Sequence, residues 1–208
     1  LGQERQGMKI MFQMMNEARI EVGNHAAAIA TAAYYAALEY AKERPQGRKL
    51  TNKDPNTSQI PIIGHPDIRR LLMFQRAVIE GGLSLLYQCN IYADLEIAAT
   101  GEEKERAALL LDFLTPVAKT YASEMGIHAV SAAMQCLGGY GYCDEFPIEQ
   151  HYRDIRIHPI HEGTTGIQSI TLLGRNVTMK NGQSCKLYLE EVNKAIHAAQ
   201  GDEFLKPY

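Results

Sequence analysis

The sequence predicts an all-α protein, an up-and-down helical bundle with an extra C-terminal helix. Apolar residues recur at three- and four-residue steps over long stretches that contain few prolines. No segment shows sustained period-two alternation of β-branched residues, so almost no sheet is expected. Long helices joined by loops pack as antiparallel neighbours, which gives the bundle.

The first two helices are expected over residues 8–44 and 66–99. The first has an alanine-rich middle, which would let another helix approach closely, and it ends at Pro45. Residues 45–65 are rich in Pro, Gly, Asn and Asp, which predicts a loop. Pro66 suits the first turn of the second helix.

A third helix is expected over residues 102–135, in which Thr115-Pro116 either kinks the helix or begins a new one. The glycines of residues 138–142 end it. The rest of the chain is predicted to contain a short helix at 147–153, a turn at 158–159, a helix over 164–179 and a tail helix over 184–199.

Composition and charge exclude several classes of function. The net charge is −3 and the basic residues are scattered among acids, so nucleic-acid binding is not expected. There is no run of about 18 apolar residues that would span a membrane. Four cysteines without C-x-x-C spacing predict reduced, mostly buried thiols of an intracellular protein. The expected compartment is the cytoplasm if the source is bacterial and the mitochondrial matrix if it is eukaryotic. The chain lacks an initiating Met, which suggests that it begins inside a longer protein.

Glu162 is the leading candidate for a catalytic residue. It precedes Gly163, which permits a tight turn or close approach to a ligand, and Thr164 or Thr165 can cap the helix that follows. Nearby isoleucines would form a partly apolar pocket, which suits a carboxylate to proton abstraction near neutral pH. The alternative is an exposed acid stabilised by a helix dipole. The isoleucines in question are Ile157, Ile160, Ile167 and Ile170.

Two other motifs also have two interpretations each. Gly138, Gly139 and Gly141 approach a phosphate-cradling pattern, but no strand precedes them, and taken alone they are more typical of a helix C-cap. Gln135, one turn earlier, can bind a cofactor edge or cap its own carbonyls. Arg44 ends the first helix and either complements its dipole or grips a phosphate.

The two histidines beside Glu162 do not predict a metal site. His158 and His161 lie beside Glu162, but Pro159 spoils the helical geometry that would bring both imidazoles to one ion. No third ligand follows at a suitable spacing, so no metal is expected.

Four patches of the sequence stand out together, at residues 15–23 (MNEARIEVG), 40–46 (YAKERPQ), 135–142 (QCLGGYGY) and 153–168 (RDIRIHPIHEGTTGIQ). In their order and separation they resemble the C-terminal helical half of the acyl-CoA dehydrogenases, flavoenzymes that introduce an α,β double bond into acyl-CoA thioesters. The likeness covers nearly the whole chain. Residues 62–70 and 114–121 and the helix after Gly182 are similar to the branch that includes methylthiopropionyl-CoA dehydrogenase-like enzymes.

The resemblance implies that Glu162 is the base that removes the α-proton while the β-hydride passes to FAD. Its backbone N–H would polarise the thioester carbonyl, with Gly163 beside the substrate. Thr164 and Gly166 would line the flavin. The substrate's CoA end would lie near Asn16 and Arg19.

The resemblance also implies partners. The FAD of a neighbouring subunit would contact Arg44, Gln46, Gln135, Gly138 and Gly139, so a homodimer or homotetramer is expected. An electron-transferring flavoprotein would accept the electrons from the reduced FAD.

The resemblance divides the chain into a C-terminal bundle at 1–182 and a helical extension at 183–208. The family's N-terminal helical domain and flavin-binding β-domain would precede both. Without them, this chain alone should bind FAD poorly and show no turnover.

Departures from the family pattern bear on specificity rather than on the base. Some members carry the base at the position of Ala18, which cannot act as one, and this favours Glu162. Asn16 stands where the family has Asp, Gly47-Arg48 where it has Phe-Gly, and His161 where it has Tyr. These changes concern the CoA contact, the adenine packing and the acyl-chain preference.

Three alternative functions stay open. An acyl-CoA oxidase relative would form peroxide. A non-catalytic binding protein of the alkylation-response type would have a basic groove and a replaced base, unlike this chain with its net charge of −3 and Glu162. A purely structural bundle is the third.

Overall fold

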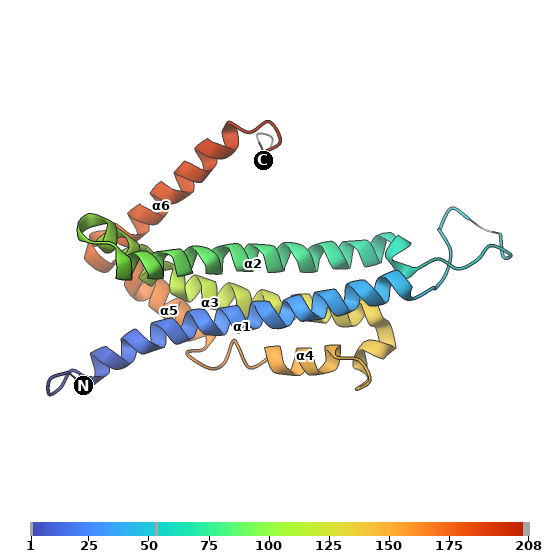
Figure 1. Ribbon diagram of the computed structural model, residues 1–208, viewed down its shortest axis with the longest axis horizontal. Coiled ribbons are helices and arrows are strands. Elements are labelled where there is room, and N and C mark those ends of the chain that lie inside the picture. The colour runs from blue at the N-terminus through green and yellow to red at the C-terminus, as the bar shows by residue number, and fades with distance from the viewer. Residues whose placement is uncertain (1, 53, 206–208) are drawn as a thin grey trace.

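The computed structural model describes residues 2–52 and 54–205, and throughout these ranges the regular elements are helical (Figure 1). One isolated antiparallel bridge, Pro45 to Pro61, is the single β contact of the described residues. The all-α prediction is therefore confirmed. The elements are α1 (Gly7–Glu43), η1 (Ile62–Gly64), α2 (Pro66–Ala98), α3 (Gly101–Leu137), η2 (Gly138–Tyr142), α4 (Ile148–Ile155), α5 (Thr165–Ile170), η3 (Thr171–Asn176) and α6 (Met179–Gln200).

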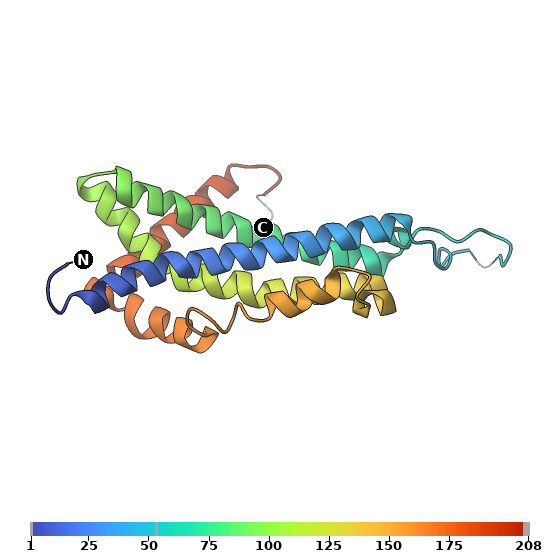
Figure 2. The same ribbon diagram turned by 60° about the horizontal axis from the view of Figure 1, so that its bottom comes forward.

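Three long helices, α1, α2 and α3, run side by side along the length of the molecule (Figures 1 and 2). Small residues on α1 allow the close approach that the sequence predicted, because Ala26, Ala33 and Ala37 are fully buried. At Gly23 a Cβ would lie only 3.3 Å from the carbonyl oxygen of Ala118 on α3. The helix backbones therefore pack closely where side chains are smallest.

Helix α3 continues through Pro116 without interruption. The predicted alternative in which a new helix begins at this position is therefore wrong. Proline has no N–H for the carbonyl four residues earlier, which is that of Asp112. That carbonyl instead accepts a hydrogen bond from Asn176 Nδ2 at 2.6 Å. The buried Asn176 lies at the end of η3, so it satisfies the freed carbonyl and fastens η3 to the bundle.

The helix expected over residues 164–179 is shorter and less regular than predicted. After α5 the chain continues as the π-helical segment η3. Lys180, Asn181 and Gly182 then adopt left-handed backbone angles, with φ of 48°, 58° and 76°. Three such residues in a row turn the chain sharply. The predicted tail helix at 184–199 is the regular part of α6 that follows them.

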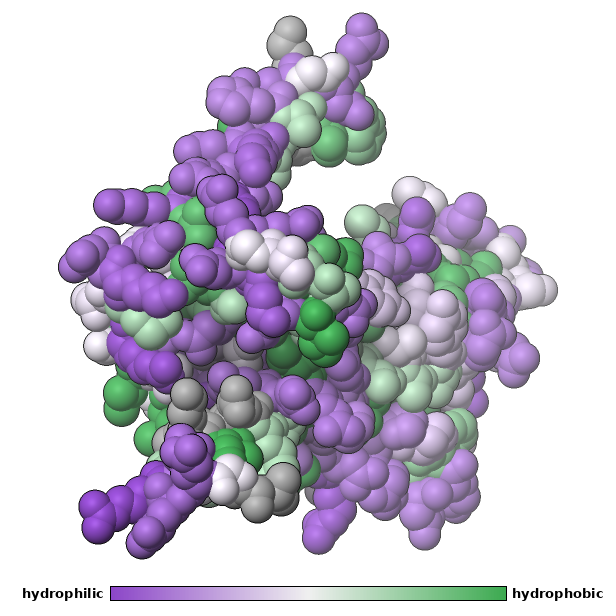
Figure 3. Space-filling view, turned by 60° about the vertical axis from the view of Figure 1, so that its left-hand side comes forward, coloured by the Kyte–Doolittle hydropathy of each residue, from purple (hydrophilic) through white to green (hydrophobic). Residues whose placement is uncertain are grey.

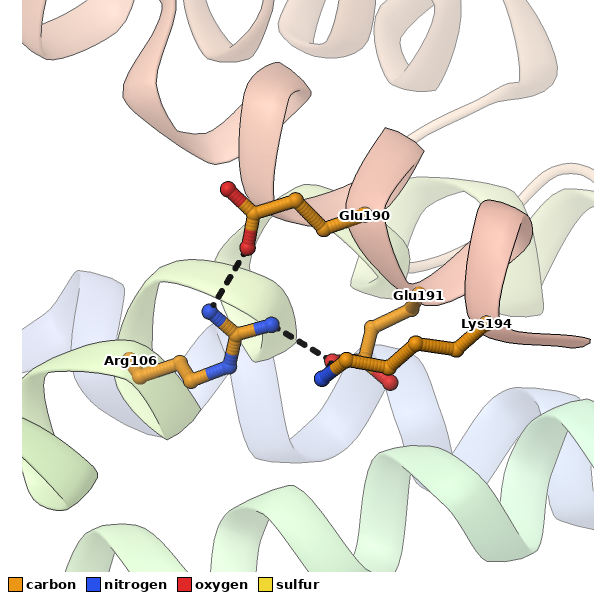
Figure 4. Close-up of polar contacts among 4 residues, drawn as sticks. All are labelled: Arg106, Glu190, Glu191 and Lys194. Atoms are coloured by element: carbon orange, nitrogen blue, oxygen red, sulfur yellow. Dashed lines mark hydrogen bonds and ion pairs between the residues drawn. The ribbon is translucent and has the colours of Figure 1, made fainter.

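Helix α6 leaves the bundle and projects away from it, with a mostly polar surface and scattered apolar patches (Figures 1 and 3). Its base is tied to α3. Tyr188 stacks on Phe113 with 5.2 Å between ring centroids. Arg106 of α3 points between two carboxylates of α6, donating to Glu190 at 3.1 Å and to Glu191 at 2.5 Å (Figure 4).

The cysteine expectation is correct for half of the residues. Cys89 and Cys136 are buried thiols, but Cys143 is exposed in the loop after η2 and Cys185 is partly exposed on α6. Cys185 packs against the edge of the core, whereas Cys143 does not belong to it. Across residues 2–52 and 54–205, no helix is long and apolar enough to cross a membrane.

Candidate functional site

Glu162 lies on a tight loop between the α4 turn and α5. Its φ is +52°, and Gly163 follows at +88°, so two consecutive residues have left-handed backbone. Thr164 is the residue that caps α5, because its Oγ1 accepts from the backbone N–H of Ile167 at 3.4 Å. The backbone N–H of Thr165 donates to the carbonyl of Pro159 at 3.2 Å, which closes the loop. The loop thus presents Glu162 directly ahead of a capped helix.

The described residues do not form the apolar pocket that was expected around Glu162. Glu162 is exposed, and the four nearby isoleucines are between 48% and 68% exposed. Side chains that are this exposed do not form a buried apolar environment. Any apolar wall around Glu162 has to come from outside the described residues.

Three polar side chains that the sequence did not single out support this loop from beneath. Lys119 Nζ donates to the carbonyl of Gly163 at 2.7 Å. Gln168 Nε2 donates to the carbonyls of Glu162 and Gly163 at 3.1 and 3.2 Å. The hydroxyl of Thr165 donates to Glu124. The loop backbone is therefore fixed while the carboxylate stays free.

A sequence signal for Lys119 exists. Thr115, Lys119 and Ser123 follow at four-residue steps on the buried side of α3. The two hydroxyls bond within the helix, whereas the lysine has no such local acceptor. A cation at a core-facing position predicts a partner from elsewhere in the fold.

Burial lowers the pKa of Lys119, and the nearby Arg19 cation lowers it further. The carboxylates of Glu124 and Glu162 oppose this effect. Lys119 is therefore a costly buried cation that lies close enough to the candidate base to sense its charge.

Arg19 is more deeply buried than expected for a residue that would contact CoA directly. Its side chain is 6% exposed, and its Nη1 donates to Asn16 Oδ1 at 3.2 Å. Burial lowers the pKa of Arg19, while the negative Glu162 and Asp112 oppose that shift. The half-exposed Asn16 lines a cleft of about 700 Å³ together with residues of α2, α3 and η3. Asn16 is thus the accessible member of the pair.

A second group of candidate residues forms at one end of the bundle, where α1 and α3 end. The Arg44 guanidinium lies over the ring of Tyr140, 5.3 Å from its centroid. Gly138 has φ of +60° and its N–H donates to the carbonyl of Gln135, so the C-cap interpretation is correct. A Cβ at Gly138 or Gly139 would have nothing within 4 Å. The glycine backbone is therefore open beside an exposed arginine.

Gln46 joins this group through its backbone. Its N–H donates to the carbonyl of Ile60 at 2.9 Å, and its carbonyl oxygen lies 2.7 Å from His65 Nε2. These contacts use the backbone of Gln46, and the side-chain amide of this exposed residue takes no part in them.

The two groups are separate. Gln135 follows Lys119 by 16 residues on α3. At 1.5 Å per residue, this places the groups roughly 24 Å apart along the helix. One end of the bundle carries Arg44 and the glycines, and the middle carries Glu162.

Among residues 2–52 and 54–205, no three His, Cys, Asp or Glu side chains are grouped so that they could hold a metal ion. His158 and His161 approach each other edge to face, with 5.3 Å between centroids. Burial lowers the pKa of His158, which favours its neutral form.

The family model for the acyl-CoA dehydrogenase C-terminal domain matches residues 5–177. The helical bundle with Glu162 on its loop is therefore this domain, and the chain belongs to the acyl-CoA dehydrogenase family.

Particular relatives are similar over most of the chain. A butyryl-CoA dehydrogenase of Syntrophomonas wolfei is 42% identical over 96% of this chain and 32% of its own length. The 3-methylmercaptopropionyl-CoA dehydrogenase of Ruegeria pomeroyi is 38% identical over 96% of this chain and 35% of its own length. Similarity to this dehydrogenase was expected, because the sequence resembles the branch that includes methylthiopropionyl-CoA dehydrogenase-like enzymes. The chain spans about a third of the length of these relatives.

Solved structures share the fold. The butyryl-CoA dehydrogenase of Megasphaera elsdenii superposes with a TM-score of 0.68 and 30% identity, covering 84% of this chain and 39% of that one. ACDH-11 of Caenorhabditis elegans, solved with C11-CoA, gives a TM-score of 0.85 at 22% identity, over 98% of this chain and 32% of that one. The second comparison shows that the fold recurs over nearly all of the chain.

Proposed function

We propose that this chain is the C-terminal helical domain of an FAD-dependent acyl-CoA dehydrogenase that uses Glu162 as its base. One observation carries the proposal: the Glu162 carboxylate is exposed, whereas the carbonyls of its loop are held by Lys119 and Gln168. An exposed carboxylate on a loop whose backbone is held in place suits proton abstraction. The names of the relatives supply the class of substrate, an acyl-CoA thioester.

The residues present fit FAD. Arg44 offers a guanidinium for a phosphate, and the open backbone at Gly138 and Gly139 leaves room for a ligand to approach. The exposed Gln46 and Gln135 lie at the same end of the bundle, whereas Thr164 and Gly166 lie beside the base. The separation of roughly 24 Å along α3 supports contacts to two flavins, one of them in a neighbouring subunit. FAD, when bound, supplies the acceptor for the hydride that leaves the β-carbon.

This chain's own part in the reaction is proton removal and positioning. Glu162 would take the α-proton, and the electron pair of that C–H bond would form the new double bond. The Glu162 backbone N–H and Gly163 would sit beside the thioester carbonyl, where the N–H would stabilise developing enolate charge. Asn16, held by Arg19, would face the CoA end.

The wider assembly belongs to the same proposal. The bundle would cover residues 1–182 and the extension 183–208, and the left-handed residues before Gln183 support that boundary. An N-terminal helical domain and a flavin-binding β-domain would precede the chain in a homodimer or homotetramer. An electron-transferring flavoprotein would take the electrons. A chain from a structure titled with such a protein, from Acidaminococcus fermentans, matches at 28% identity and a TM-score of 0.66 over 83% of this chain and 39% of that one.

The test uses the full-length protein with FAD and butyryl-CoA without oxygen. Bleaching of the flavin absorbance should be about 10²- to 10⁴-fold slower in Glu162→Gln, because general base catalysis is lost. The matched control is Glu103→Gln, an exposed glutamate at the start of α3. Bleaching at the wild-type rate in Glu162→Gln would show that the base is elsewhere. Steady peroxide formation in air would favour the oxidase alternative.

A further inference from the structure

The loop that carries Glu162 is held in a conformation that it would not keep unaided. A non-glycine residue at φ of +52° is unfavourable, and Gly163 beside it is also left-handed. Such backbone is strained and persists only where the surroundings impose it. At Gly163 a Cβ would lie 2.5 Å from Gln168 Nε2, so the supporting amide occupies the space directly against the loop.

Both carbonyls of this strained pair have donors. The Gly163 carbonyl accepts from Lys119 Nζ on α3 and from Gln168 Nε2 on α5. The Glu162 carbonyl accepts from Gln168 as well. Lys119 and Gln168 are both fully buried, at 0% and 1% exposure, so neither donor has water as an alternative partner.

A third contact fixes the other side of the loop. The Thr165 hydroxyl donates to Glu124, which lies on α3 a little more than one turn after Lys119. The loop is therefore fastened to one rigid helix at two points, which restricts both sliding and rotation.

Holding one carbonyl with the buried Lys119 ammonium has a high cost in free energy. A buried ammonium loses its hydration, and the acceptor that the structure shows for it is a neutral carbonyl. A well-packed apolar side chain of similar volume would often be at least as stable. Stability alone therefore does not explain a lysine here.

We propose that Lys119 is a positioning residue for the Glu162 base, and that Gln168 acts with it on the same carbonyl. By holding Gly163, Lys119 would keep the left-handed loop closed and the Glu162 carboxylate at one place relative to the bundle. This inference rests on the proposed function, because it assumes that Glu162 is the base.

The test compares Lys119→Met, which keeps the volume but removes the donor, with Lys186→Met on the exposed face of α6. In the full-length protein with FAD, Lys119→Met should lower kcat about 10- to 100-fold, since a displacement of about 1 Å in a reacting group has that effect. KM for butyryl-CoA, flavin content and melting temperature should stay near wild type. Lys186→Met should change none of these.

A second variant keeps the test informative if Lys119→Met folds poorly. Gln168→Leu removes both amide bonds to the loop and should reduce kcat in the same way. The double variant should lose less than the product of the single losses, because both side chains act on one carbonyl. Amide hydrogen exchange at residues 162–166 should be faster in each variant than in wild type.

Two results would overturn the inference: wild-type kcat in Lys119→Met and Gln168→Leu, or losses that simply follow flavin content and melting temperature. Glu162→Gln, measured alongside, separates this failure from failure of the proposed function. If Glu162→Gln is inactive and Lys119→Met has wild-type kcat, only the positioning role is wrong. If Glu162→Gln is fully active, the base assignment fails first.

Discussion

Replacing Gly141 with alanine should destabilise the chain by about 1–3 kcal/mol, the usual cost of overpacking. A Cβ at this position in η2 would lie 2.6 Å from the carbonyl oxygen of Met134, whereas ordinary contact begins at 3.4 Å. The backbone would have to open by about 0.8 Å, the difference of those distances. Met134 belongs to the last turns of α3, where helical hydrogen bonds resist such a shift.

The neighbouring glycines provide matched controls. Gly139→Ala meets nothing within 4 Å and should change stability by less than about 0.5 kcal/mol. Gly138→Ala also has space, but its φ of +60° should cost about 1–3 kcal/mol. Equilibrium unfolding of the chain in urea, followed by circular dichroism, measures all three.

Equal stability of Gly141→Ala and Gly139→Ala would refute the steric reasoning. Gly139→Ala carries a second prediction. If FAD approaches this open backbone as proposed, the variant should lower the flavin content of the full-length protein without lowering its stability.

Three further predictions concern the bundle. Ile155→Ala, at a fully buried site, should cost about 2–5 kcal/mol of unfolding free energy, while the half-exposed Ile157→Ala costs far less. Burial raises the pKa of Cys89 and Cys136 from 9.0 to about 11. The thiols therefore lose their protons at lower pH in the unfolded chain than in the folded one, and the free energy of unfolding should fall as the pH rises from 9 to 11. The expected fall is at most about 1.4 kcal/mol per pH unit for each thiol. Urea unfolding across that window should show a shallower fall in Cys136→Ala; an unchanged slope would contradict the assignment. Arg106→Met should speed proteolysis within α6, whereas substituting an arginine paired within its own helix should not.

Much of the fold could be predicted because its long helices have strong local signals. Apolar periodicity and the stop at Pro45 placed α1 within a residue at each end, from 8–44 expected to Gly7–Glu43 observed. The effect of Pro116 could not be predicted, since it depends on Asn176, which is distant in sequence and bonds to the freed carbonyl. The direction of α6 likewise depends on the left-handed residues 180–182, of which only Gly182 signals such backbone.

Local sequence motifs predict which residues form the candidate site, but they do not predict the surroundings of those residues. Glu162 and the capping Thr164 follow from local sequence, and Arg44 lies beside the glycine segment as the resemblance implied. The exposure of Glu162 and the role of Lys119 depend on packing between elements, which periodicity does not encode. The four-residue spacing with Thr115 and Ser123 places Lys119 on the buried side of its helix, but it does not identify the Gly163 carbonyl as the acceptor.

The most direct test of Glu162 as the base is α-proton exchange in deuterated water. The full-length protein would be given a 3-thiaacyl-CoA, in which sulfur replaces the β-methylene, so that proton removal occurs without hydride transfer. We predict that Glu162→Gln slows exchange by about 10²-fold or more, with flavin content and ligand binding retained. Exchange at the wild-type rate in this variant would contradict the account.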